Sequence, residues 1–359
     1  MNKLVIIGNG FDLAHGLETR YSDFLLWEIN EAFKQTNIVK PSSFHIESPL
    51  FAIESNYRIC QHPSLDPCEF EDIAGFLQYL KDNKDGRLII KIKYSYSFVE
   101  HLIQFANRNW VDIEREYYIK LLFVYQLRSS KNNTWRKILT ELNSALELLR
   151  SELVKYLKCI KYNGCLQEIM DCFNYEIGIN RLNLFDKVLF LNFNYTSTVE
   201  NYLQSIDNDF VKVNYVHGKL EDENNPIIFG YGDETDKNYE TIEDLNENEF
   251  TRHFKSFSYL TTSNYQDLFE YLGKDKFEVH IMGHSCGLSD RVLFNHIFEH
   301  DNFDRVQLYY YQYGEKDYEN DYFQKTQELS RYFKLNSKHK MRTKVVPFSK
   351  SKPLTTYKP

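Results

Sequence analysis

The sequence predicts an α/β fold in which a doubly wound, mainly parallel β-sheet is interrupted by a large helical insertion. Short runs of β-branched and other apolar residues, typical of strands buried on both faces, occur near both ends of the chain. The middle of the chain instead repeats apolar residues at helical spacing. A length of 359 residues fits one α/β core with such an insertion, or two domains.

Several of the predicted strands end on Gly, Asn or His, which are residue types that turn a chain or bind a ligand. The first apolar run covers residues 3–8 and ends on glycine. Later runs of the same kind cover residues 188–191, 211–216, 277–282, 306–311 and 344–348. Because the ligand crevice of an open α/β sheet lies at the carboxyl ends of its strands, we expect the functional site there.

The predicted insertion is helical. From Trp135 to Ile160, leucines and other apolar residues recur every three or four positions, and Asn133 or Thr134 is placed to cap the first turn. Residues 97–126 also have a helical pattern. We therefore divide the chain into a Rossmann-like nucleotide-binding core, formed by residues 1–25 and 181–359, and a helical insertion of residues 26–180.

Composition excludes several classes of protein. With 43 basic and 51 acidic residues the net charge is −8, so nucleic acid is not expected as a partner. Six cysteines occur without a C-x-x-C pair, which argues against a disulfide framework or a zinc ribbon. The first apolar run is too short for a signal peptide and no run is long enough to span a bilayer, so we expect a cytoplasmic protein without membrane contact.

The first motif is the turn Gly8, Asn9, Gly10, Phe11 and Asp12, which follows the first strand. Glycine at such a point permits a tight turn, and the backbone N–H groups of the following helix can approach a phosphate. A turn that binds nothing is the plainer alternative. Leucine occupies the position of the third glycine in the dinucleotide fingerprint, so a dehydrogenase is not expected.

Two further motifs follow predicted strands. Asn194 could donate to and accept from sugar hydroxyls, and Thr196 could cap a following helix, although a plain Asx turn explains both residues equally well. His217 is followed by Gly218 and is placed to act as a general base near neutral pH. A lone histidine is more often structural, but as the third strand-end motif His217 is the best catalytic candidate in the chain.

Gly283, His284 and Ser285 begin a segment with two interpretations. Taken literally, the pattern G-x-S-x-G is a nucleophile elbow, but Asp290 and His296 lie within one helix of the serine, too close in sequence for the usual triad geometry. We favour a second ligand-facing turn, whose N–H groups and hydroxyl would bind phosphate or ribose.

Two other patterns have plain explanations. His296 and His300 match H-x-x-E-H, but no third ligand is evident, so no metal is expected. Asp112 and Glu114 lie beside a tryptophan, and a solvated helix face accounts for them.

Taken together, these motifs resemble the AbiH family of bacteriophage abortive-infection proteins. The resemblance rests on Gly8 to Asp12, Tyr21 to Phe24, Trp110 to Glu114, Asn192 to Thr196, His217-Gly218, and Gly283 to His300. It implies an antiviral defence protein that confers phage resistance. It is also compatible with activation by a phage-derived trigger, with binding to a partner defence protein and with oligomerisation.

The order of the motifs is also similar, more remotely, to that of sirtuin-like NAD-binding domains. This resemblance implies that Asn194 orients the ribose or an attacking water and that His217 acts as a base or ribose partner. Gly8, Gly10 and Ser285 would then bind the phosphates and the adenosine ribose of NAD.

Three departures limit the sirtuin resemblance. Thr196 stands where sirtuins have an acidic residue, Glu18 and Thr19 replace the proline-aspartate that follows the first helix turn, and the four-cysteine zinc module is absent. A protein deacylase is therefore not expected, and an NAD glycohydrolase that cleaves the nicotinamide–ribose bond is the preferred prediction. The alternatives are a non-catalytic nucleotide-sensing or partner-binding defence module, and a serine hydrolase with Ser285 as nucleophile.

Overall fold

The chain folds into two compact units in the computed structural model. We call them the parallel-sheet unit, which comprises Met1–Leu17, Lys161–Thr241 and His253–Pro359, and the insertion unit, which comprises Glu18–Ile160 and Ile242–Arg252. The chain thus leaves the first unit at residue 17 and returns at 161, whereas the sequence placed these points at 25 and 181. The structure describes residues 1–35, 37–40, 43–57, 69–82, 88–106, 113–128, 134–162, 164–179, 186–204, 206, 210–334 and 338–356.

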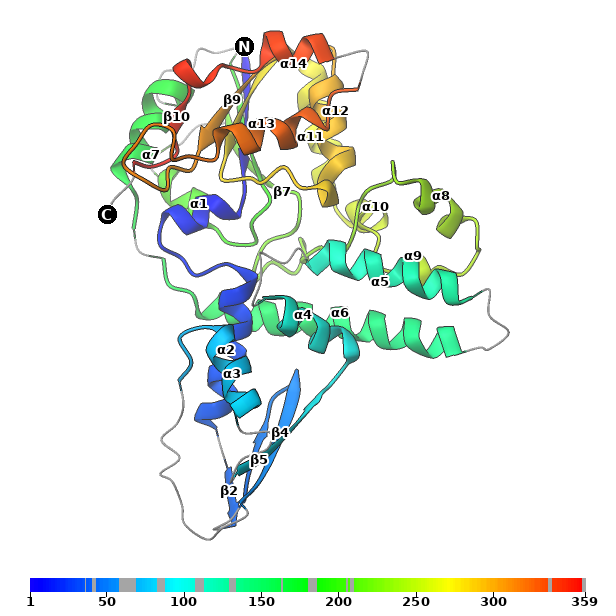
Figure 1. Cartoon of the computed structure of the whole chain (residues 1–359). Helices are drawn as coiled ribbons and strands as arrows, with labels where there is room; N and C mark the ends of the chain where they lie inside the picture. Colours follow the sequence, from blue (N-terminus) through cyan, green and yellow to red (C-terminus); the bar gives the residue numbers. More distant parts are fainter. Residues whose placement is uncertain are drawn as a thin grey trace. The chain divides into compact units, whose positions relative to one another are not determined.

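The parallel-sheet unit is built on a six-stranded sheet with the order β10-β9-β8-β1-β6-β7, and its paired strands run parallel. Figure 1 labels β7, β9 and β10 of this sheet. This confirms the predicted α/β class with a mainly parallel sheet. The strands are β1 (Asn2–Ile7), β6 (Val188–Asn192), β7 (Val211–Tyr215), β8 (Phe277–Met282), β9 (Phe303–Tyr310) and β10 (Lys352–Pro353).

The register brings the strand ends together. Ile7 at the end of the central strand β1 pairs with Asn192 of β6 and with Met282 of β8, and Asn192 pairs with Tyr215 of β7. The turns that follow these four strands therefore start side by side at one edge of the sheet.

Side chains alternate along each buried strand, so both faces of this sheet carry apolar residues. Helices cover both faces and bury these residues. Leu4 and Ile6 of β1 face one core, which α11 (Asn264–Lys274), α12 (Arg291–Glu299) and the end of α13 (Tyr322–Ser330) help to form. Val5 and Ile7 face the other core. That core also receives side chains from α7 (Gln167–Asp171), the π-helical turn η1 (Cys172–Ile177) and η2 (Thr198–Tyr202).

Short elements complete the parallel-sheet unit. They are α1 (Asn9–Ala14), α8 (Lys237–Glu243), at whose end the chain enters the insertion unit, α10 (Lys255–Ser258), η3 (Tyr259–Thr261), η4 (Leu288–Asp290), α14 (Lys338–Lys344) and η6 (Phe348–Lys350). The strand predicted for residues 344–348 is wrong: Val345 forms one isolated bridge with Val306, and the edge strand is β10. Pro347 has no N–H group to continue a ladder at that point.

The insertion unit combines helices with a second sheet. Its helices are α2 (Tyr21–Lys34), α3 (Ile73–Asp82), α4 (Ser97–Ala106), α5 (Ile113–Leu127), α6 (Thr134–Cys159) and α9 (Asn248–Thr251). The leucine stripe predicted for residues 135–160 is the buried face of α6. Within the part of the chain that the structure describes, no helix is both long enough and apolar enough to cross a membrane.

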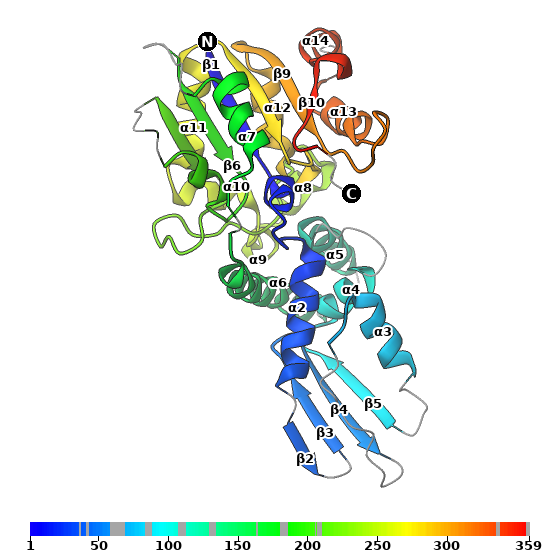
Figure 2. The same ribbon diagram turned by 90° about the vertical axis from the view of Figure 1, so that its left-hand side faces the viewer.

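The second sheet was not predicted from the sequence. Strands β2 (Asn37–Lys40), β3 (Ser43–Glu47), β4 (Phe51–Tyr57) and β5 (Leu88–Tyr94) pair antiparallel in that order, and Figure 2 shows β3, β4 and β5 side by side. Each strand is short and mixes apolar with charged residues, so it lacks the continuous apolar run that marks the strands of the parallel sheet.

Candidate functional site

The turns after β1 and β8 are locked together by glycine contacts. The Gly10 N–H donates to the Gly283 carbonyl at 2.8 Å. A Cβ on Gly10 would lie 2.7 Å from that oxygen, and one on Gly283 would lie 2.1 Å from the backbone nitrogen of Phe11. Gly283 also has a φ of +73°, which side chains rarely adopt. These glycines therefore permit two strand-end turns to touch, and the Gly10 amide is bound within the protein.

The other residues of the first turn have different surroundings. Asn9 is half-buried at the start of α1. The Phe11 side chain is fully buried in the core and stacks on Phe173, so it serves packing. A Cβ on Gly8 would lie 2.5 Å from the Cα of His284, which makes Gly8 a second point of close contact between the two turns.

Asn194 joins the ends of β1 and β6. Its side-chain Nδ2 donates to the Gly8 carbonyl at 3.0 Å, and its backbone N–H donates to Oδ1 of Asn192 at 3.0 Å. Asn194 is 8% exposed, so these bonds hold its amide in one orientation.

Asp12 brings a buried carboxylate to the same place. The Thr196 hydroxyl donates to its Oδ2 at 2.6 Å, and Thr198 lies 3.3 Å from that hydroxyl. Asp12 is 1% exposed, and its Oδ1 has no hydrogen-bond partner among the described residues. Burial raises the pKa of Asp12, while the hydrogen bond from Thr196 and the nearby polar groups of Thr198 and Asn194 oppose the rise. The acidic residue that sirtuins have at the position of Thr196 is absent here, but the Asp12 carboxyl group lies next to Thr196.

His217, at the end of β7, belongs to a buried ionic group that we call the His217 group: His217, Asp290, Lys255 and Tyr259. Its Nε2 lies 3.0 Å from Oδ1 of Asp290 and 3.1 Å from the Tyr259 hydroxyl. The Lys255 ammonium lies 3.0 Å from the same carboxylate oxygen and is 0% exposed.

The charges of the His217 group follow from these contacts. Burial lowers the pKa of His217, and the positive charge of Lys255 lowers it further, whereas Asp290 raises it. Burial alone would raise the pKa of Asp290, but Lys255 and His217 hold it well below its ordinary value. Asp290 is therefore an anion and His217 is neutral. Its Nε2–H then donates to the carboxylate, which leaves Nδ1 as the basic nitrogen.

His284 lies close to His217 through one aromatic ring. Phe193 is 5.0 Å from the His217 ring and 4.3 Å from the His284 ring, measured between centroids, and both pairs meet edge to face. The Cys286 N–H donates to Nδ1 of His284 at 2.9 Å. Burial is the main cause that lowers the pKa of His284, to about 3, so this histidine is also neutral.

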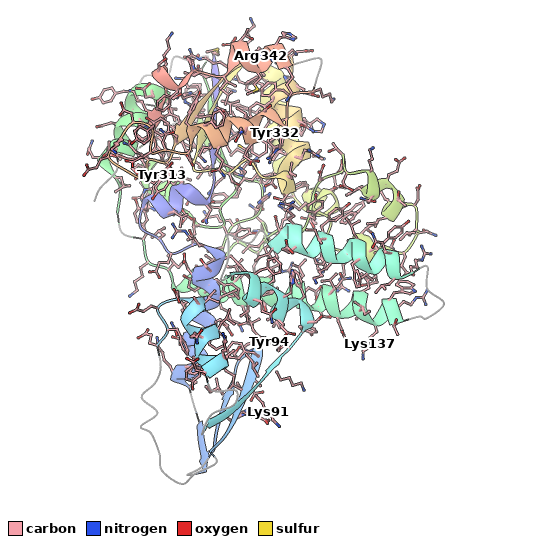
Figure 3. All side chains as sticks on the ribbon, in the orientation of Figure 1. Lys91, Tyr94, Lys137, Tyr313, Tyr332 and Arg342 are labelled. Atoms are coloured by element: carbon pink, nitrogen blue, oxygen red, sulfur yellow. The ribbon has the colours of Figure 1, made fainter. Side chains whose placement is uncertain are left out.

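The turn after β8 presents Ser285 to solvent. No hydrogen bond joins the Ser285 hydroxyl to an imidazole or carboxylate of the described residues, so nothing activates it as the nucleophile of an elbow. Tyr332, labelled in Figure 3, fixes the next two residues by donating to the carbonyls of Cys286 at 2.5 Å and Gly287 at 2.7 Å. Lys325 brings a positive charge to this turn, because its ammonium lies 3.2 Å from the His284 carbonyl.

Three residues of the site were not predicted from the sequence: Lys255, Tyr259 and Lys325. The signal for Lys255 was the glycine-rich stretch around Tyr231, which has no obvious purpose in a polar loop. In the structure Tyr231 forms a parallel bridge with Phe254, and a Cβ on Gly232 would lie 3.1 Å from the Cβ of Lys255. This stretch covers the lysine and keeps it from water.

The remaining patterns do not join the strand ends. His296 is exposed on α12, where its Nδ1 lies 2.8 Å from the Val292 carbonyl oxygen. His300 is the C-cap residue of that helix, and its Nδ1 accepts from the Asn302 N–H at 3.1 Å. Among the described residues no three His, Cys, Asp or Glu side chains are grouped to hold a metal ion. Glu114 lies in the first turn of α5, and Asp112 lies outside the described residues.

Comparison with known proteins identifies the family. No curated protein matches the sequence. Residues 4–313 match the family described as Bacteriophage abortive infection AbiH, and this match takes in all four strand-end turns. Because it also covers most of the 359 residues, the chain belongs to the AbiH family of bacteriophage abortive infection proteins.

Proposed function

We propose that this abortive infection protein binds NAD or a related nucleotide at the strand ends and hydrolyses its nicotinamide–ribose bond. The observation that carries the proposal is the buried contact between Asp290 and His217, at 3.0 Å, at the sheet edge where the Asn194 amide and the Asp12 carboxylate are also buried. An anion that fixes the tautomer of a neutral histidine is the arrangement that general-base catalysis requires.

The polar groups around Asp12 fit the hydroxyl groups of a ribose. Oδ1 of Asp12 is a buried acceptor without a partner, and Thr196 and Asn194 lie next to it. In this proposal Asp12 supplies the carboxylate that the sequence pattern lacks at position 196. An unpaired buried acceptor destabilises a fold by about 1–3 kcal/mol. A ribose hydroxyl that donates to this oxygen would remove that cost.

The proposed reaction needs little from the protein beyond orientation and a base. The bond between the ribose C1′ and the pyridinium nitrogen breaks, and its electron pair neutralises the nicotinamide that leaves. Nδ1 of His217 takes a proton from the attacking water, whose oxygen bonds to C1′. Asp290 stabilises the protonated imidazole, and Asn194 orients the ribose or the water.

Nicotinamide release tests this proposal. Purified protein is incubated with NAD, with and without phage lysate, and free nicotinamide is measured by chromatography. We expect His217→Ala and Asp290→Asn to slow release by a factor of about 100 to 10,000, the usual contribution of a general base. His296→Ala, which removes an exposed histidine of the same unit, is the matched control and should leave the rate unchanged. Equal NAD loss by wild type and His217→Ala would overturn the catalytic assignment.

A non-catalytic nucleotide sensor is the second candidate. It is supported by Oδ1 of Asp12, a buried acceptor without a partner among the described residues, which would serve nucleotide binding whether or not a bond is cleaved. In that case NAD or ADP-ribose would bind wild type without being cleaved, and Asp12→Asn would weaken binding. The serine hydrolase alternative would require labelling by a fluorophosphonate probe that disappears in Ser285→Ala.

A further inference from the structure

A second concave site lies away from the strand-end turns, beside the edge strand β7. A cavity of about 280 Å³ opens there between β6, β7 and α11. Its lining includes Lys187, just before β6, together with Lys212 and Asn214 of β7. None of the residues of the strand-end site lines it.

The face of the sheet that lines this cavity is apolar on β6 and polar on β7. In the β-ladder Lys212 pairs with Leu189 and Asn214 pairs with Leu191, and both leucines belong to the apolar core under α11. Where the neighbouring strand carries leucine, β7 therefore carries a cation and an amide. A lysine on an edge strand also discourages strand addition, but this does not explain a buried asparagine.

Asn214 has an unused acceptor. The residue is 6% exposed, its Nδ2 donates to the Asn264 carbonyl at 2.7 Å, and no hydrogen-bond partner of its Oδ1 occurs in the part of the chain that the structure describes. Asn264 also lines the cavity. Because Asn214 lines the cavity, its buried amide oxygen is an acceptor there that still lacks an N–H or O–H donor.

Three lysines converge on the cavity. Lys274 pairs with Glu270 four residues earlier, and this contact, together with the charges of Lys187 and Lys212, lowers the pKa of Glu270. Within the described residues, the ammonium groups of Lys187 and Lys212 make no ion pair or hydrogen bond. They are exposed and available to an anion at the cavity mouth.

We propose that this cavity binds a small hydroxylated phosphate ester, of the sugar-phosphate class. Lys187 and Lys212 would bind the phosphate. The unpartnered Asn214 oxygen and the Asp267 carboxylate, which also lines the cavity, would accept from the hydroxyls. The cavity volume is close to the lower end of small-molecule sites, which suits a ligand of this size.

Calorimetric titration of the full chain with ribose 5-phosphate, inorganic phosphate and ribose tests the site. We expect ribose 5-phosphate to bind more tightly than inorganic phosphate, and ribose alone not to bind. Lys187→Gln and Lys212→Gln should each weaken binding about tenfold, and added salt should weaken it further. Glu270→Gln should strengthen binding, because it removes a competing carboxylate.

Matched controls separate this site from the strand ends. Lys137→Gln, a change at an exposed lysine of α6 that is labelled in Figure 3, should bind ribose 5-phosphate as wild type does. His217→Ala should also keep this binding, whatever becomes of the NAD reaction. Wild-type affinity in Lys187→Gln and Lys212→Gln, or loss of binding in His217→Ala with retention in Lys212→Gln, would overturn the proposal. Absence of binding at millimolar ribose 5-phosphate would overturn it as well.

Discussion

Two groups of residues meet at the same edge of the parallel sheet, one held together by backbone contacts and the other by buried ionic contacts. The turns after β1 and β8 fit because Gly10 and Gly283 have no side chains, and the contact between them is backbone against backbone. The ends of β7 and β8 are joined instead through the His217 group, in which a lysine, a carboxylate and an imidazole are all buried.

This difference separates residues that shape the site from residues that could act in it. Glycine contacts fix the distance between two turns but carry no charge and no transferable proton. The His217 group carries both, and it is stable only while Lys255 and Asp290 stay paired, because each would be costly to bury alone. Substitutions in the His217 group should therefore destabilise the fold by leaving a buried charge unpaired, whereas substitutions of the glycines should destabilise it by forcing the two turns apart.

The largest effect is expected from Lys255→Met. It keeps the apolar stem but leaves the Asp290 carboxylate buried without its ammonium partner, so we expect a loss of about 3–5 kcal/mol in the free energy of unfolding. Urea denaturation followed by circular dichroism measures this loss.

Two variants show whether charge is the cause. Lys255→Met combined with Asp290→Asn should be more stable than Lys255→Met alone, since no unpaired charge remains. Lys137→Met, at a lysine whose side chain is 82% exposed, should change stability by less than about 0.5 kcal/mol. If Lys255→Met were as stable as wild type, Asp290 would not be an anion in the folded protein.

A smaller but still large effect is expected from Gly283→Ala. The new Cβ would lie 2.1 Å from the Phe11 nitrogen in a residue with a φ of +73°, so the two turns must separate. We expect a loss of about 3 kcal/mol or more, measured by the same denaturation.

Gly16→Ala is the matched control for the glycine turns. Gly16 has nearly the same φ, +72°, but no atom of the described residues lies within 4 Å of an added Cβ. It should lose only the conformational contribution of about 1 kcal/mol. Equal losses in Gly16→Ala and Gly283→Ala would mean that backbone strain, and not contact between the turns, accounts for the glycine.

The contrast also explains what could be predicted from sequence. Apolar runs that end on Gly, Asn or His indicated the sheet and the four strand-end turns, because burial and chain reversal are local requirements. The sequence could not show that Gly10 and Gly283 touch, since their contact depends on which strands are neighbours. A glycine required for packing and one required for a phosphate look the same in a sequence.

The His217 group was hidden for a related reason. Asp290 was considered only as a partner of Ser285, its neighbour in sequence, whereas it pairs with a histidine 73 positions earlier (290 − 217). Lys255 lies in a helix of four residues, too short to show any periodicity. Pairs of charges buried by distant segments follow from topology, and no local pattern marks them.

The smallest effect is expected for each unit of pH, and the buried imidazoles His217 and His284 contribute to it whereas the glycine turns do not. His284 has a folded pKa of about 3, against an ordinary value of 6.5 for the unfolded chain. Below pH 6.5 the unfolded state therefore binds a proton that the folded state does not. Stability should fall as pH decreases from 6.5 toward 3, by at most about 1.4 kcal/mol per pH unit for this residue.

His217 acts in the same direction, because burial and Lys255 lower its pKa too. Asp290 adds a loss only below its ordinary pKa of 3.8, where the unfolded carboxyl is protonated first. Between pH 7 and 4.5, Glu28, whose pKa burial raises to about 7, and His15, whose pKa burial lowers, also titrate. The contribution of His284 is therefore read from the difference between wild type and His284→Asn, which should reduce the slope, whereas Gly16→Ala should lower stability equally at every pH. A slope unchanged in His284→Asn would place the proton uptake elsewhere and would leave His217 as the only buried imidazole of the site whose charge state matters.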